Sequence, residues 1–136
     1  MKLMIIALLT LGTLAAQAAT TYDVSCKANG ITISGTVSVE AEHSSGISAP
    51  AAGNLGVVTA DSSIQREFVG TVATQDFNVD KSAQRMRIEL WTDSDTKPLY
   101  AFSITQVEYA DGSKQTTSVV AIDQQPYQAD CSVNQN

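Results

Sequence analysis

Alternation of apolar and polar residues with a period of two is the feature that most constrains the fold of this chain. After residue 18, no segment shows the sustained 3.6-residue period of an amphipathic helix. In the segment 31–40, isoleucine and valine alternate with threonine, serine and glutamate. This pattern is typical of a strand that turns one face toward a core. The chain is therefore predicted to be all-β.

The sequence Asn29-Gly30 predicts the first hairpin. Asn-Gly is the preferred sequence of a two-residue type I′ turn, because both residues tolerate positive φ. Pairing Ala28 with Ile31 then places Cys26 opposite Ile33, so the apolar faces of the two strands coincide.

The sequence Asp111-Gly112 predicts a second hairpin, between the segments 98–109 and 114–122. The polar stretch 93–97 is expected to connect the preceding strand, 83–92, to this hairpin. The three strands then share one apolar face. The expected cross-strand partners are Ile104 with Val119, Phe102 with Ala121, Leu90 with Tyr100, and Ile88 with Phe102.

Weaker patterns complete the expected sheet. The segments 55–60 and 64–74 are expected to form a hairpin over residues 61–63, and residues 127–133 a short last strand. The stretch 43–54, rich in Ser, Ala, Gly and Pro, is predicted to be the longest loop. The fold predicted from seven or eight strands with local connections is a small antiparallel β-barrel, a meander. A two-sheet β-sandwich is the alternative.

Residues 1–18 are predicted to be a cleavable signal peptide. Lys2 precedes an apolar run that ends in Ala16-Gln17-Ala18, with small residues at the two positions that signal peptidase recognises. The run is shorter than the roughly 20 apolar residues of a membrane span, so no span is expected after cleavage. Residues 19–136 are then expected to be a single β domain in the bacterial periplasm or outside the cell.

The two cysteines, Cys26 and Cys131, are predicted to form a disulfide, because an exported chain meets an oxidising compartment. The bond would close a loop of about 105 residues, which chain-entropy reasoning values at about 4–5 kcal/mol. In an eight-strand meander the two cysteines would lie at opposite barrel ends. We therefore expect an offset last strand, an odd number of strands, or a tail that crosses an end of the barrel.

Charge and motif content restrict the function. The chain has 8 basic and 14 acidic residues, and an acidic surface repels phosphate backbones, so nucleic-acid binding is not expected. A single histidine, His43, provides too little for a catalytic zinc site. Asp93-x-Asp95 begins like a calcium loop, but Lys97 occupies the next ligand position. We predict no catalytic residue, no metal ligand and no cofactor.

Trp91 is the strongest candidate for a binding residue. It shares the polar face of the segment 83–92 with three charged residues, Arg85, Arg87 and Glu89. An aromatic residue on a polar sheet face can stack on a sugar or anchor a protein partner. The alternative is a tryptophan packed at a strand end, and the loop 43–54 is a rival site. Three further apolar residues lie off the main apolar phase and suggest a second apolar layer or an exposed patch: Val69, Val120 and Ile122.

The pattern Tyr22-x-x-x-Cys26-x-x-x-Gly30, followed by an alternating strand, resembles the opening of the periplasmic C-type lysozyme inhibitors of bacteria. The resemblance covers about fifteen residues and implies a small β-barrel tied by a disulfide near the chain ends. The Ser-Gly-x-x-Tyr loop that enters the lysozyme cleft in that family is absent here. Ser45-Gly46 is followed by Ile47 and Ser48, so the inhibitory function is not carried over.

These observations favour an exported, non-enzymatic binding protein that recognises a protein or a glycan. A barrel that holds a small apolar ligand is the first alternative, since barrels bind ligands inside their mouth. A periplasmic enzyme-inhibitor-like protein is another alternative. A hydrolase has the least support, because the sequence offers no nucleophile–base pair. The large side chains expected inside the barrel indicate a filled interior.

Overall fold

The computed structural model describes residues 20–40, 48–77 and 83–136. These residues form strands and turns, with no helix among them. The predicted signal peptide and His43 lie outside the described residues. The strands are β1 (Thr20–Ala28), β2 (Ile31–Val39), β3 (Ser48–Val58), β4 (Ser63–Phe77), β5 (Ala83–Thr92), β6 (Tyr100–Glu108), β7 (Lys114–Ile122), β8 (Gln125–Gln128) and β9 (Asp130–Gln135).

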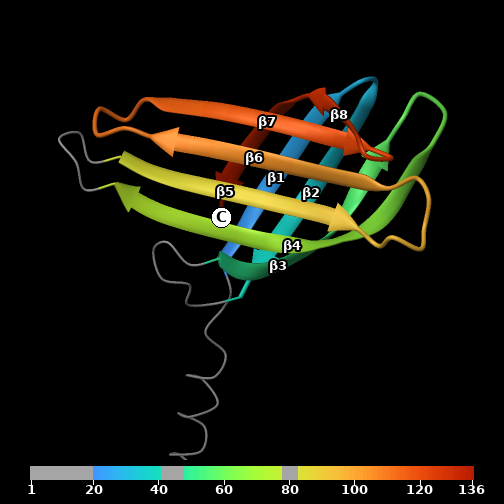
Figure 1. The fold of residues 1–136 in the computed structure, drawn as a ribbon, viewed down its shortest axis with the longest axis horizontal. Coiled ribbons are helices and arrows are strands. Elements are labelled where there is room, and N and C mark those ends of the chain that lie inside the picture. The colour runs from blue at the N-terminus through green and yellow to red at the C-terminus, as the bar shows by residue number, and fades with distance from the viewer. Residues whose placement is uncertain (1–19, 41–47, 78–82) are drawn as a thin grey trace, which may run out of the picture.

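All nine of these strands belong to one antiparallel sheet in the order β8-β7-β6-β5-β4-β3-β2-β1-β9. Strands β1 to β8 follow one another as a meander, and β9 returns to pair with β1. Figure 1 shows the sheet curling on itself, with β4–β7 across the front and β1 and β2 running diagonally behind them. The predicted antiparallel barrel is confirmed in this nearly closed form, with nine strands rather than seven or eight.

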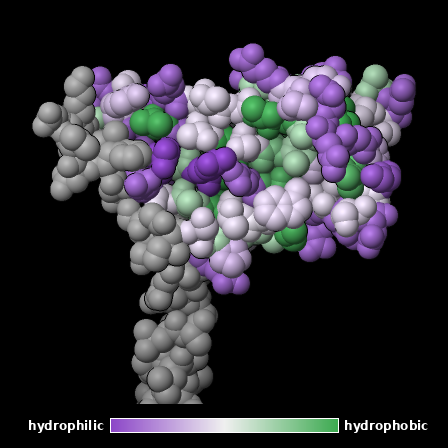
Figure 2. All heavy atoms as spheres, viewed as in Figure 1, coloured by the Kyte–Doolittle hydropathy of each residue, from purple (hydrophilic) through white to green (hydrophobic). Residues whose placement is uncertain are grey.

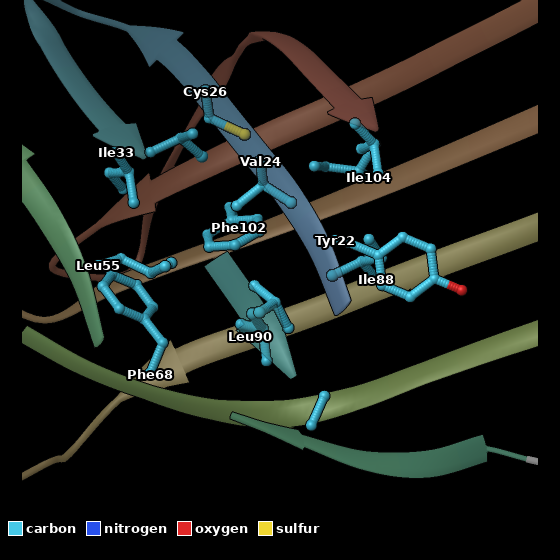
Figure 3. Close-up of a cluster of buried hydrophobic side chains, with 14 of the residues drawn as sticks. Tyr22, Val24, Cys26, Ile33, Leu55, Phe68, Ile88, Leu90, Phe102 and Ile104 are labelled. Carbon is cyan, nitrogen blue, oxygen red and sulfur yellow. The ribbon is translucent and has the colours of Figure 1, made fainter. Parts of the chain in front are cut away.

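The core lies between the two layers of this barrel. Side chains from the front strands, among them Phe68, Leu90 and Phe102, meet side chains from β1 and β2 (Figure 3). The rings of Phe68 and Phe102 are 5.7 Å apart, in a tilted arrangement. Ile33 and Leu55 are completely buried. Large branched and aromatic side chains therefore fill the interior, as the sequence indicated.

The first predicted hairpin is confirmed. Ala28 pairs with Ile31, and Cys26 with Ile33. Asn29 and Gly30 have φ values of 49° and 76°, the positive angles that a type I′ turn requires.

The predicted register of the second hairpin is wrong by one residue. Phe102 pairs with Val120 and Ile104 with Ser118, in place of Ala121 and Val119. The loop has three residues rather than two, because Tyr109 donates its backbone N–H to Ser113 and Gly112 takes a φ of 85°. A slip of one residue exchanges the two faces of a strand. Val120 is consequently buried and Val119 is exposed.

The predicted partners across β5 and β6 are wrong by two residues, although the shared face is correct. Leu90 pairs with Phe102, and Ile88 with Ile104. A shift of two keeps each side chain on its own face. The loop 93–99 is longer than the turn that the sequence suggested. Arg66 helps to hold it, donating to the carbonyl oxygens of Thr96 and Pro98 at 3.0 Å each.

The stretch predicted as the longest loop is largely strand. Residues 48–54 belong to β3, which pairs with both β2 and β4, while residues 43–47 lie outside the described residues. Gly53 in this stretch serves close packing, since a Cβ there would lie 2.6 Å from the carbonyl oxygen of Thr36. The predicted hairpin between β3 and β4 is present, with its turn at 59–62.

The predicted disulfide is confirmed. The structure also shows how the two cysteines come to lie at the same end of the barrel. The single strand predicted at 127–133 is instead two strands, β8 against β7 and β9 against β1, separated at Ala129. Cys131 therefore lies near the start of β9, directly opposite Cys26 near the end of β1. The Cα atoms of the bonded pair are 4.1 Å apart. The strand count is odd, and the tail crosses from one edge of the sheet to the other.

Candidate binding surface

The four residues predicted to bind a partner lie on the outer face of β5. Arg85, Arg87, Glu89 and Trp91 occupy alternate positions, opposite to the buried Ile88 and Leu90. Trp91 is 46% exposed. The alternative of a packed tryptophan at the strand end is therefore wrong, and the ring is available to solvent.

The charged residues beside Trp91 are partnered within the molecule. Arg87 forms an ion pair with Glu89, and both side chains are well exposed. Arg85 donates to the Oε1 atom of Gln75 on β4 at 2.7 Å. Exposed pairs of this kind contribute little to stability, about 0–1 kcal/mol. Their effect is to orient the side chains along the strand and to leave little net charge around Arg87 and Glu89.

The sheet register places apolar residues on both sides of Trp91. On the outer face, Val69 of β4 is opposite Trp91, and Ala101 of β6 is opposite Trp91 on its other side. The alignment continues to Ala121 and Pro126, and in the other direction to Ala52. We call this set the apolar row: Ala52, Val69, Trp91, Ala101, Ala121 and Pro126.

The apolar row crosses six neighbouring strands, β3 to β8. At the usual spacing of 4.8 Å between strands, it extends for about 24 Å along the surface. Figure 2 shows this face, where apolar and neutral residues gather over part of β4–β7, and hydrophilic residues lie along much of the rim and also near the middle of the face. Val119, 39% exposed, widens the row on β7.

Two shallow depressions border Trp91. One, of about 440 Å³, lies between Trp91, Val69 and the polar side chains of Glu67, Asp93 and Ser94. The other, of about 220 Å³, is lined mainly by apolar atoms of Trp91, Ala101, Val119 and neighbouring residues. An apolar ring beside hydrogen-bonding groups suits a sugar ring or a protein side chain.

The sequence identified Trp91 but only part of its surroundings. Val69 was recognisable, because it lies off the apolar phase of β4. Ala121 and Val119 were assigned to the core by the incorrect β6–β7 register, and both face outward. Ala52 belongs to the stretch predicted as a loop. The apolar row depends on the registers of five strand pairs, which no single segment reveals.

A separate hollow, the end cleft, lies where the ends of β4–β7 extend beyond β1 and β9 (Figure 1). It has a volume of about 370 Å³ and a mostly polar lining. Its residues are Tyr22, Thr74, Gln84, Met86, Gln106, Glu108, Lys114, Val133, Asn134 and Gln135. Burial raises the pKa of the Tyr22 hydroxyl above its usual value.

Asp93 and Asp95 form a local turn, in which the backbone N–H of Asp95 donates to Asp93 at 3.1 Å. No group of three or more metal-ligating side chains comes together in the described ranges. Within the same residues, no helix has the length and hydrophobicity needed to cross a membrane. Comparisons with models of protein families, with curated proteins and with solved structures find no match to this chain.

Proposed function

We propose that this chain is an exported, non-enzymatic binding protein that recognises a protein or a glycan through the apolar row. The observation that carries the proposal is the exposure of Trp91 in the middle of that row. Tryptophan is among the residues most enriched where binding energy concentrates. A contiguous exposed apolar strip with polar edges is characteristic of recognition sites.

Two features support export to an oxidising compartment. The N-terminal sequence has the order of charge, apolar run and small residues that signal peptidase recognises. The bond between Cys26 and Cys131 belongs to a class that persists outside the cytoplasm. A binding protein in such a compartment would present the outer face of β5 to surface glycans or to other exported proteins.

The fluorescence of Trp91 provides a direct test, because it is the only tryptophan of the chain. Soluble chito-, malto- and cello-oligosaccharides are titrated against the purified protein for the glycan class. For the protein class, immobilised wild-type protein is compared with Trp91→Ala in capture from a periplasmic extract, and each captured protein is then titrated in purified form. A partner on this surface should shift the emission of Trp91.

Measured by isothermal titration calorimetry, because this variant has no tryptophan, Trp91→Ala should weaken binding by about 2 kcal/mol, or about 30-fold in dissociation constant, with little change in thermal stability. Val58→Ala is the matched control, since Val58 is 44% exposed and lies outside the apolar row. Equal binding by the two variants would contradict the proposal. A large loss of stability in Trp91→Ala would show a structural role instead.

A further inference from the structure

The barrel is not closed along its whole length. β8 pairs only with the second half of β7, from Val119 to Ile122. Beyond Ala129 the chain leaves β7 and pairs with β1 as β9. Figure 1 shows β8 beside one end of β7 only. Among the described strands, none pairs with the free side of residues 114–117 of β7 or with the outer side of β9. We call the gap between these two edges the seam.

Hydrogen bonds next to the seam show which backbone groups face it on β7. The N–H of Ala129 donates to the carbonyl oxygen of Ser118 at 3.1 Å, so the backbone groups of Ser118 point away from β6. Backbone direction alternates along an antiparallel strand. Thr116 and Lys114 therefore present their N–H and C=O groups to the seam, and all of residues 114–117 are exposed.

The same reasoning applies to the other side of the seam. Asn136 donates its backbone N–H to Thr21 of β1 at 3.0 Å, so residue 136 faces β1. By alternation, Gln135 and Val133 turn their N–H and C=O groups away from β1. Both edges thus present regularly spaced donors and acceptors that no described strand satisfies.

The end cleft adjoins this seam. Lys114 of β7 and Val133 and Gln135 of β9 line it together with inward-facing residues of the front strands. Its other side chains are largely uncharged and polar, such as Thr74 and Gln106. A strand placed in the seam would turn alternate side chains into this hollow.

We propose that the seam is a strand-addition site for an extended peptide segment of another protein. The backbone of an added strand can pair with alternating N–H and C=O groups at strand spacing, which gives affinity. Pockets that accept alternate side chains of the added strand then give sequence specificity. The amide and hydroxyl lining of the end cleft matches uncharged polar side chains. The disulfide keeps the site open, because it holds Cys131 on β1 and prevents the tail from continuing along β7.

The probe for this proposal is the blocked hexapeptide acetyl-Thr-Gln-Thr-Gln-Thr-Gln-amide, titrated into the ¹⁵N-labelled, disulfide-bonded protein. The matched control is the same peptide with alternate backbone nitrogens methylated, which keeps the side chains and removes backbone donors. In the free protein, the amides of Thr116 and Val133 should exchange quickly with solvent. At a peptide concentration of ten times the dissociation constant, their exchange should slow about 11-fold.

Protection of these amides by the unmodified peptide, and not by the methylated one, supports strand addition. Equal binding of both peptides, protection confined to the apolar row, or no protection at about 10 mM peptide would overturn it. Thr116→Pro gives an independent readout: it removes a donor that faces the seam and should leave folding intact. It should abolish peptide binding, whereas Thr116→Val should retain it.

Discussion

Loss of the disulfide should reduce the stability of this protein by an amount that its loop length sets. The bond joins residues separated by 105 positions, and a closure of that length restricts the unfolded chain by about 4.7 kcal/mol at 25 °C. Cys26 is almost completely buried, so alanine substitution also removes packing. Two forms separate these effects: the reduced wild-type protein, which keeps both sulfur atoms, and the double variant Cys26→Ala/Cys131→Ala.

Urea unfolding, followed by the fluorescence of Trp91 and by circular dichroism, measures the difference. The reduced protein should lose about 4–5 kcal/mol, and the double variant about 1–2 kcal/mol more for the missing side-chain contacts. The slope of unfolding free energy against urea should rise, because an unbridged chain exposes more surface. A loss below about 1 kcal/mol with an unchanged slope would refute the reasoning.

Two further predictions follow from local contacts. In urea unfolding, Gly70→Ala should reduce stability by about 3 kcal/mol, because a Cβ at position 70 would overlap the carbonyl oxygen of Glu89. The control Gly56→Ala should change stability by less than about 0.5 kcal/mol. Equal effects of the two substitutions would contradict the close approach at Gly70. Side-chain hydrogen bonds, first from Asn136 and then from β2, lower the pKa of Asp23 below its usual value of 3.8. The ionised Asp23 carboxylate therefore stabilises the folded protein above pH 3.8, and this stabilisation is lost as the pH falls through the lowered pKa. The unfolding free energies of wild type and Asp23→Asn, measured against pH, should accordingly converge in acid.

The strand register of a hairpin could be predicted from the sequence only where the turn residues allow a single loop length. Asn29-Gly30 allows essentially one hairpin geometry, and every predicted pair of β1 and β2 is present. Asp111-Gly112 fits both a two-residue and a three-residue loop, since glycine at positive φ serves in either. The choice between them depends on which face of β7 packs better. Val120 is buried by the three-residue loop, and this preference arises from tertiary packing.

In the candidate site, too, features within one strand could be predicted from the sequence, whereas features that depend on the pairing of several strands could not. The outward position of Trp91 followed from alternation within one strand, whereas its exposure is known only from the structure. The apolar row required the correct offsets of all strands from β3 to β8, so an error of one residue at β7 hid Ala121 from it. The stretch 48–54 has loop-like composition, yet close contact with the backbone of β2 requires glycine at position 53. Composition does not distinguish these two reasons for small residues.

The position of the disulfide also determines how the molecule would carry mechanical load. β1 and β9 are antiparallel partners, with Thr21 beside Asn136 at one end and the two cysteines near the other. Force applied at Thr20 and Asn136 would open this pair one residue at a time, as a zipper. The opening would stop at the covalent bond between Cys26 and Cys131. The rest of the barrel, including Trp91 and the apolar row, would bear no tension while the bond remained intact.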